Sequence, residues 1–152
     1  MHSFSRHPLL DPNSIDLPAY AHLPGVNGRH EEGFLDHVIN LAPELTLSDG
    51  SGANIPWLFG LRLFDVGFFW EAHEVWEAVW LRAAPNSRER FLLQGMIHLT
   101  NAFLKQKCGQ VKAAQRLKTL AEECFVRAFQ GAKGLSVMGV DFQEVELLMM
   151  KL

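Results

Sequence analysis

One short segment of the chain concentrates the residue types that carry out acid–base or metal chemistry. Within residues 71–77, the imidazole of His73 stands among three carboxylates, those of Glu71, Glu74 and Glu77. On a helix His73 and Glu77 are four residues apart, so their side chains can touch. A carboxylate in that position can fix the imidazole tautomer or share a metal ion with it. We expect the three glutamates on the polar side of the helix, opposite its apolar side, with His73 at the boundary.

A second polar group recurs in a later apolar segment. Nearly every position from 91 to 104 is apolar, and the exceptions are Gln94, His98 and Asn101, which follow helical spacing. Gly95 stands beside this stripe and would let another helix approach closely. If the stripe faced the helix of the first segment, two histidines and one or more carboxylates would converge between two helices.

Such a cluster could bind a divalent metal, because imidazole and carboxylate ligands suit zinc, iron or nickel, and an unfilled position could activate water. The spacing does not reproduce two familiar metal motifs. His73 and Glu74 begin like the H-E-x-x-H of zinc proteases, but Glu77 replaces the second histidine. The Glu-x-x-His of di-iron bundles fails because Trp70 stands where Glu is needed. The candidates for a metal or small-molecule site are Glu71, His73, Glu74, Glu77, Gln94 and His98.

The same residues have a structural interpretation. His73 and His98 could lie at the edge of the core, hydrogen-bonded to carboxylates or backbone, and the glutamates could form a solvated or partly buried acidic face. A helix with aromatic side chains on several sides needs partners on several sides, which favours a homodimer. The aromatic residues concerned are Trp57, Trp70, Trp76, Trp80, Phe64, Phe68 and Phe69. An enzyme and a non-catalytic interaction module therefore both stay open.

The elements that position these residues are all expected to be helices. No segment alternates with period two between hairpin turns, and short connectors join apolar segments of helical period. Ser87 is a predicted N-cap, Gly109 a predicted C-cap, and Asp141 with Glu144 a second N-cap pair. We predict helices at about 32–41, 56–81, 87–107 and 111–129 and after Asp141, with Gly60 or Gly67 able to divide the second.

The N-terminal residues 1–33 are predicted to be irregular. They carry four of the seven prolines, which bias the chain towards extended structure. Their apolar residues, among them Leu9, Leu10, Ile15, Leu17, Tyr20 and Leu23, predict that this arm packs on the core. The fold class is therefore all-α: a single-domain helical bundle over residues 34–152 with an irregular, Pro-rich arm over residues 1–33.

Composition limits the partners. The 152 residues include 48% hydrophobic and 20% charged residues, as in a globular protein, and the net charge of −3 offers no basic field for nucleic acid. No apolar stretch approaches the length of a membrane span, and the first residues do not resemble a signal peptide, so we expect a cytoplasmic protein. Cys108 and Cys124 are expected as buried thiols rather than as a disulfide.

Residues 64–77, followed by Trp80 and by residues 91–95, resemble a bacterial and archaeal family known as domain of unknown function 309. The resemblance covers the middle of the chain, to about Leu117, and the ends loosely. It implies a small all-helical bundle and no particular activity. It also implies that the family motif includes Glu71, His73, Glu74, Glu77, Trp80 and Gln94. The chain departs at His98, where the family more often has Gln, which weighs against a second histidine ligand.

Overall fold

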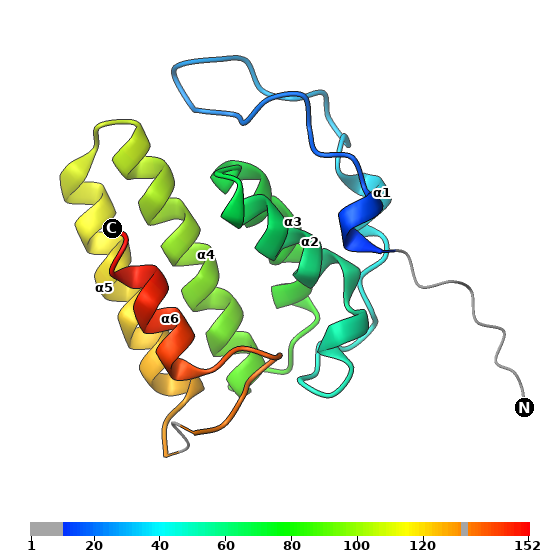
Figure 1. The fold of residues 1–152 in the computed structure, drawn as a ribbon, viewed down its shortest axis with the longest axis vertical. Helices are drawn as coiled ribbons and strands as arrows, with labels where there is room; N and C mark the ends of the chain where they lie inside the picture. The colour runs from blue at the N-terminus through cyan, green and yellow to red at the C-terminus, as the bar shows by residue number, and fades with distance from the viewer. Residues whose placement is uncertain (1–10, 132–133) are drawn as a thin grey trace, which may run out of the picture.

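The computed structural model describes residues 11–131 and 134–152, and in this part of the chain it contains six α-helices and no strand (Figure 1). The prediction of an all-α fold is confirmed. Two short 3-10 helices, η1 (Pro12–Ser14) and η2 (Ser51–Ala53), accompany them. The α-helices are α1 (Asp36–Ile39), α2 (Ile55–Asp65), α3 (Phe69–Leu81), α4 (Arg88–Lys107), α5 (Val111–Ala128) and α6 (Phe142–Met149).

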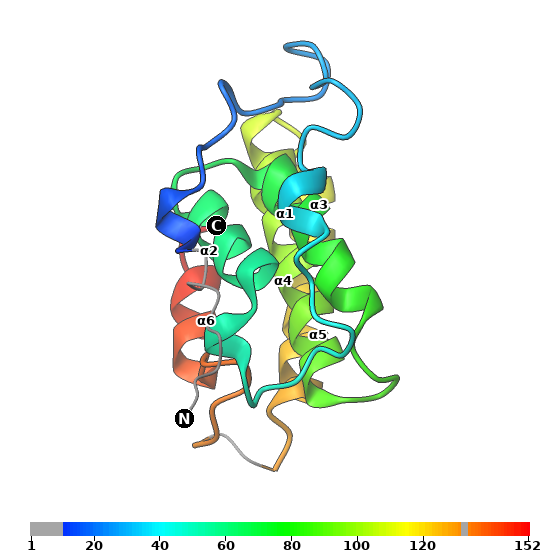
Figure 2. The same ribbon diagram turned by 90° about the vertical axis from the view of Figure 1, so that its right-hand side faces the viewer.

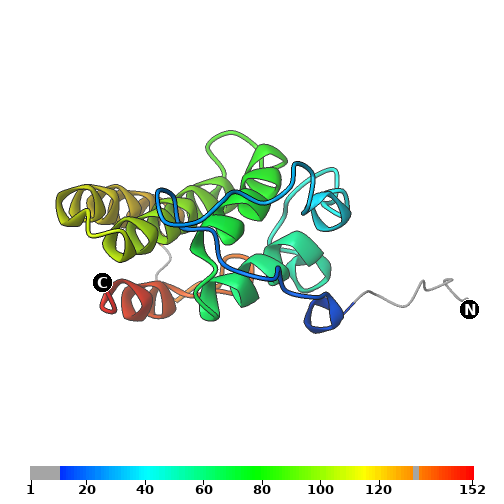
Figure 3. The same cartoon turned by 90° about the horizontal axis from the view of Figure 1, so that it is seen from above.

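The helices form a bundle around α4. The most extensive packing joins α4 to α5, and α3 packs against both α4 and α2. Seen from above in Figure 3, α6 lies beneath the α4 and α5 pair. Gly95 explains the close approach of α5, because a Cβ atom added there would lie 2.5 Å from Cε1 of Phe125. The predicted role of Gly95 is therefore confirmed.

The predicted helix over residues 56–81 is divided at Gly67. This residue has φ of 87°, a left-handed conformation that glycine adopts without steric cost, and it separates α2 from α3. Gly60 instead stays inside α2, where the indole of Trp76 occupies the space of a side chain. The Trp76 Nε1–H donates to the carbonyl oxygen of Trp57 at 3.2 Å. The break thus sets the direction of α3, which carries the candidate residues.

The later helix boundaries follow the predicted caps. Ser87 Oγ accepts from the Arg90 N–H at 3.1 Å, and Gly109 has φ of 76° directly after α4. Asp141 and Glu144 form a reciprocal capping box at the start of α6. The helix predicted at 32–41 is much shorter: only α1 forms, because Gly33 takes φ of 79° before it.

The aromatic side chains meet most of their partners within the chain. Trp57, Phe64, Phe69 and Trp76 are buried in the core, whereas Trp70, Trp80 and Phe68 are partly buried and pack against it. The Trp57 Nε1–H donates to the Met138 carbonyl at 3.1 Å. The two cysteines are free and half-buried, as thiols rather than a bridge.

The described part of the arm, residues 11–33, is irregular apart from η1, which lies beside α2, and the residues after η1 loop past the upper end of the bundle before the chain reaches α1 (Figure 2). Ile15 is buried, and Leu17 and Leu23 pack against the core. Arg62 Nη1 donates to the carbonyls of Pro12 and Ile15 at 2.9 and 2.6 Å. Residues 1–10, with Leu9 and Leu10, lie outside the described residues, and the division at residue 33 stays a prediction.

Candidate functional site

The predicted pair on α3 is confirmed. His73 Nε2 lies 2.9 Å from Glu77 Oε1, one helical turn away. Glu74 joins them: His73, Glu74 and Glu77 each offer one ligand atom, and these atoms all lie within 4.8 Å of one another. The His73 side chain is 20% exposed and that of Glu77 50%, so this cation cluster stands at the surface of α3 with one side open to solvent.

The ionised form of the Glu74 carboxyl group is disfavoured in the folded protein, because its pKa is raised. Burial is the largest cause of its raised pKa, and the neighbouring carboxylates of Glu77 and Glu71 raise it further. The nearby side chains of His73 and Arg29 act in the opposite direction. Since burial and like charges both disfavour the ionised form, a positive ion beside Glu74 would restore it.

Glu71 was expected on the polar side of the helix, and this expectation is wrong. Glu71 is completely buried, in the first turn of α3, where the helix dipole favours a carboxylate. Its Oε2 accepts from the backbone N–H of His22 at 2.7 Å and lies 2.6 Å from Nε2 of His30. Its Oε1 is buried with no hydrogen-bond partner in the described chain. The arm covers this side of α3, which the helical pattern alone could not reveal.

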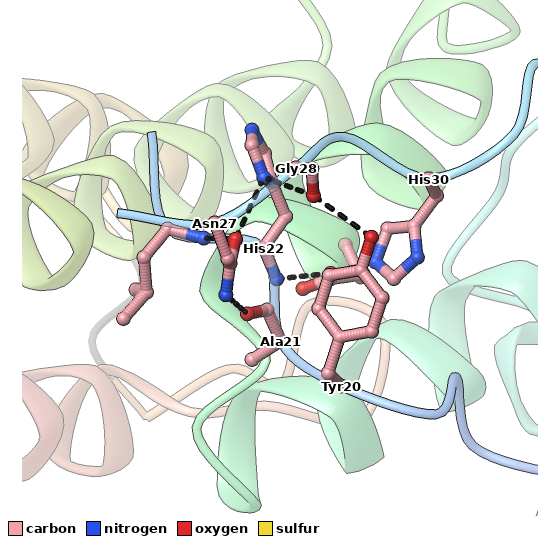
Figure 4. A network of polar contacts seen from close by, with 8 residues as sticks. Tyr20, Ala21, His22, Asn27, Gly28 and His30 are labelled. Atoms are coloured by element: carbon pink, nitrogen blue, oxygen red, sulfur yellow. Dashed lines mark hydrogen bonds and ion pairs between the residues drawn. The ribbon is translucent and has the colours of Figure 1, made fainter. Parts of the chain in front are cut away.

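The arm is held in shape by its own hydrogen bonds, as Figure 4 shows. The Tyr20 hydroxyl donates to the Gly28 carbonyl at 2.8 Å, and Asn27 Nδ2 donates to the Ala21 carbonyl at 3.0 Å. The ring Nδ1 of His22 lies 3.1 Å from Asn27 Oδ1 and 3.2 Å from the Gly28 carbonyl. Because both are acceptors, Nδ1 carries a hydrogen. Residues 20–28 therefore form a small preformed loop over α3.

His30 is the functional candidate that the sequence pattern missed. Its ring is stacked between Tyr20, with centroids 4.4 Å apart, and Phe34, with centroids 4.0 Å apart. Figure 4 shows the Tyr20 and His30 rings side by side. No periodicity links an irregular arm to a helix forty residues later. The only local signal was the presence of His22 and His30 among aromatic residues in a segment expected to be apolar and packed.

A polar pocket of about 440 Å³ adjoins both His30 and Glu74 of the cation cluster. The arm supplies one wall and α3 the other, and the lining residues are Arg29, His30, Glu31, Glu32, Gly33, Phe34, Trp70 and Glu74. The Arg29 guanidinium lies 5.7 Å from the centre of the Trp70 ring. A second cavity of about 470 Å³ between α2 and α6 is largely apolar and shares none of these residues. The polar pocket is therefore the one beside the candidate chemistry.

His98 does not enter the cation cluster, and the Gln94 side chain forms no hydrogen bond with it among the described residues. Both are half-buried on α4, and neither side chain forms a hydrogen bond within the described residues. Burial lowers the pKa of His98. Ile97, the residue before His98, shares a cavity of about 320 Å³ with Glu77, Trp80 and Leu81. The α4 residue that lines this cavity together with Glu77 is therefore the apolar Ile97 and not His98.

The family model described as domain of unknown function (DUF309) matches residues 57–117, from α2 to the first turns of α5. Neither the curated proteins nor the solved structures gave a match. The matched segment holds the cation cluster and Glu71, whereas His22 and His30 lie outside it. Residues 57–117 are therefore similar to the domain of unknown function 309 family, in agreement with the resemblance of the sequence motif.

Proposed function

We propose that the protein binds a divalent metal ion through His73, Glu74 and Glu77, for use on a small molecule in the polar pocket. The observation that carries the proposal is the convergence of three ligand atoms within 4.8 Å on one face of α3. Ligand atoms around zinc lie about 2.0–2.2 Å from the ion, so atoms this close to one another can share it after small side-chain rotations. Three protein ligands on one side leave positions for water or substrate.

The electrostatics of Glu74 support the same assignment. Its pKa is raised, first by burial and then by the carboxylates of Glu77 and Glu71. A divalent ion would neutralise this repulsion and favour the ionised form of Glu74. Glu74 also lines the polar pocket, so the ion would stand in the pocket wall, where a ligand can reach it.

The experiment is elemental analysis of protein purified without chelator and without a histidine tag. Wild type is expected to carry stoichiometric metal, and His73→Ala to lose it while keeping its helical circular dichroism. His98→Ala is the matched control, since His98 is a half-buried histidine outside the cluster, and it should retain the metal. Wild type without metal, or equal metal in all three proteins, would rule the proposal out.

A second candidate is a structural or interaction module without catalysis. The observation that favours it is the burial of Glu71 with two hydrogen-bond partners from the arm, the arrangement of a network that fixes the position of a segment. On this interpretation His73→Ala changes stability by about 1 to 3 kcal/mol and no metal is bound. The absence of nucleic-acid binding and the cytoplasmic location stay predictions. None of the described helices is both long and apolar enough to cross a membrane.

A homodimer through the aromatic-rich helix belongs to this second candidate. Leu81 ends α3 with 67% of its surface exposed, beside the partly buried Trp80. If that end of α3 is the seam, Leu81→Glu should convert a dimer to a monomer in sedimentation equilibrium without changing the unfolding midpoint at low concentration. A monomeric wild type at all concentrations would exclude the homodimer.

A further inference from the structure

The hydrogen bonds of Glu71 fix the tautomer of His30. Oε2 of Glu71 accepts the backbone N–H of His22 and lies 2.6 Å from His30 Nε2. A carboxylate oxygen accepts, so Nε2 carries the hydrogen and donates it. In the neutral ring the lone pair is then on Nδ1, which has no hydrogen-bond partner among the described residues. Nδ1 is not fully buried, so solvent reaches it.

The ring of His30 is held in one orientation. It is stacked between Tyr20 and Phe34, and only 7% of its side chain is exposed. Tyr20 is itself fixed by its hydroxyl bond to the Gly28 carbonyl. Since His30 lines the polar pocket, the open Nδ1 is the part of the ring available to a ligand there. A rigid imidazole with one nitrogen on a buried carboxylate and the other open has the geometry of an oriented general base.

We propose that His30 is the proton acceptor of the polar pocket and that Glu71 positions it. In the step, the O–H bond of a ligand hydroxyl or water breaks, its electron pair stays on oxygen, and the proton forms a new N–H bond at Nδ1. The imidazolium that results is stabilised by the Glu71 carboxylate and by the faces of Tyr20 and Phe34. His30 can accept this proton without a metal ion. The proposal rests on the proposed function in one respect: an ion bound at Glu74 would stabilise the oxyanion that the step leaves on the ligand.

The pocket also indicates the class of ligand. Arg29 lines it and forms no ion pair or hydrogen bond within the described residues. Its guanidinium can pair with a carboxylate or phosphate group in two-point geometry. Glu31 and Glu32 line the pocket too and, like Arg29, they are exposed to solvent, which screens their charge. The structure therefore points to a small hydroxylated molecule with one anionic group, within about 440 Å³.

The test is carbethoxylation of the intact protein by diethyl pyrocarbonate at pH 7.5 with chelator present. An unprotonated imidazole nitrogen attacks the reagent's carbonyl carbon, and an N–C bond forms as the C–O bond breaks and ethyl carbonate leaves. Peptide mass spectrometry gives the rate at each histidine. His30 should react at least as fast as His37, the exposed control on α1, although His30 is nearly covered. A rate well below that of His37 would make His30 a structural residue and overturn the proposal.

Variants separate the role of Glu71 from simple opening of the arm. In Glu71→Gln the rate at His30 should fall by roughly tenfold, because an uncharged amide holds the Nε2 hydrogen, and with it the ring tautomer, less firmly than a carboxylate does. Glu123→Gln, at an exposed carboxylate on α5 outside the pocket, is the control and should leave that rate unchanged. An unchanged rate in Glu71→Gln contradicts the positioning role. A His30 rate equal to the amide hydrogen-exchange rate of residues 20–30 contradicts the proposal too, because the ring would then react only when the arm opens.

These outcomes are independent of metal binding. The chelator removes any ion, so a failure of His73, Glu74 and Glu77 to hold metal leaves the expected reactivity of His30 in place. Conversely, an unreactive His30 leaves the elemental analysis of the cation cluster unaffected.

Discussion

At the scale of single residues, Glu71 connects the two parts of the site. Its buried Oε2 accepts hydrogen bonds from the backbone N–H of His22 and from the ring Nε2–H of His30. The same helix carries the hydrogen-bonded pair of His73 and Glu77 in its next turns. The arm thereby gains a polar anchor on α3 in addition to its apolar contacts. We therefore expect the loss of the Glu71 side chain to lower the free energy of unfolding more than the loss of the Glu77 side chain.

Glu71→Ala should destabilise the protein strongly. It removes the acceptor of two buried donors, and each unsatisfied group costs about 1–3 kcal/mol, so we expect a loss of about 3 kcal/mol in urea unfolding. Glu77→Ala, whose side chain is 50% exposed, should cost less than about 1 kcal/mol. Equal losses in the two variants would show that Glu71 does not anchor the arm.

His98 should make stability depend on pH. Burial lowers its pKa below the ordinary 6.5, so the folded protein resists a proton that the unfolded chain accepts. Stability is then complete above 6.5 and falls as pH decreases towards the folded pKa. Between pH 7.5 and 5.5 the free energy of unfolding in urea should therefore decrease less in His98→Gln than in the wild type. The exposed His37→Gln should keep it, and identical pH profiles for wild type and His98→Gln would contradict the effect.

At the scale of the elements, local signals were sufficient for α4, α5 and α6. Their caps at Ser87, Gly109 and Asp141 depend on neighbouring residues only, and the structure places them as predicted. The length of α1 was overestimated because Gly33 interrupts the pattern. The break between α2 and α3 was one of two positions that the sequence left open, since only the packing of Trp76 against Gly60 distinguishes them.

The contact of α4 with α5 provides a prediction at this scale. In Gly95→Ala the new Cβ would lie 2.5 Å from Phe125, so one of the two helices must shift, at a cost of about 2 kcal/mol in thermal or urea unfolding. Gly52→Ala is the control, because a Cβ there meets nothing within 4 Å, and it should change stability by less than about 0.5 kcal/mol. A neutral Gly95→Ala would mean that the helix pair is not closely packed.

At the scale of the whole molecule, the site forms where the arm meets the bundle. The cation cluster on α3 could be predicted from sequence, because His73, Glu74 and Glu77 share one helix face. The polar pocket could not, because Arg29 and His30 reach α3 through an irregular segment and contacts of long sequence separation. For the same reason the burial of Glu71 and the separation of His98 from the cluster appear only in three dimensions.

The central claim is a divalent ion at His73, Glu74 and Glu77, and anomalous diffraction from crystals grown with Zn²⁺ tests it most directly. The account predicts an anomalous peak about 2 Å from ligand atoms of these three residues, at the wall of the polar pocket. The peak should be absent from His73→Ala crystals grown in the same way. No peak at this cluster in the wild type, or peaks only at other carboxylates of the surface, would contradict the claim.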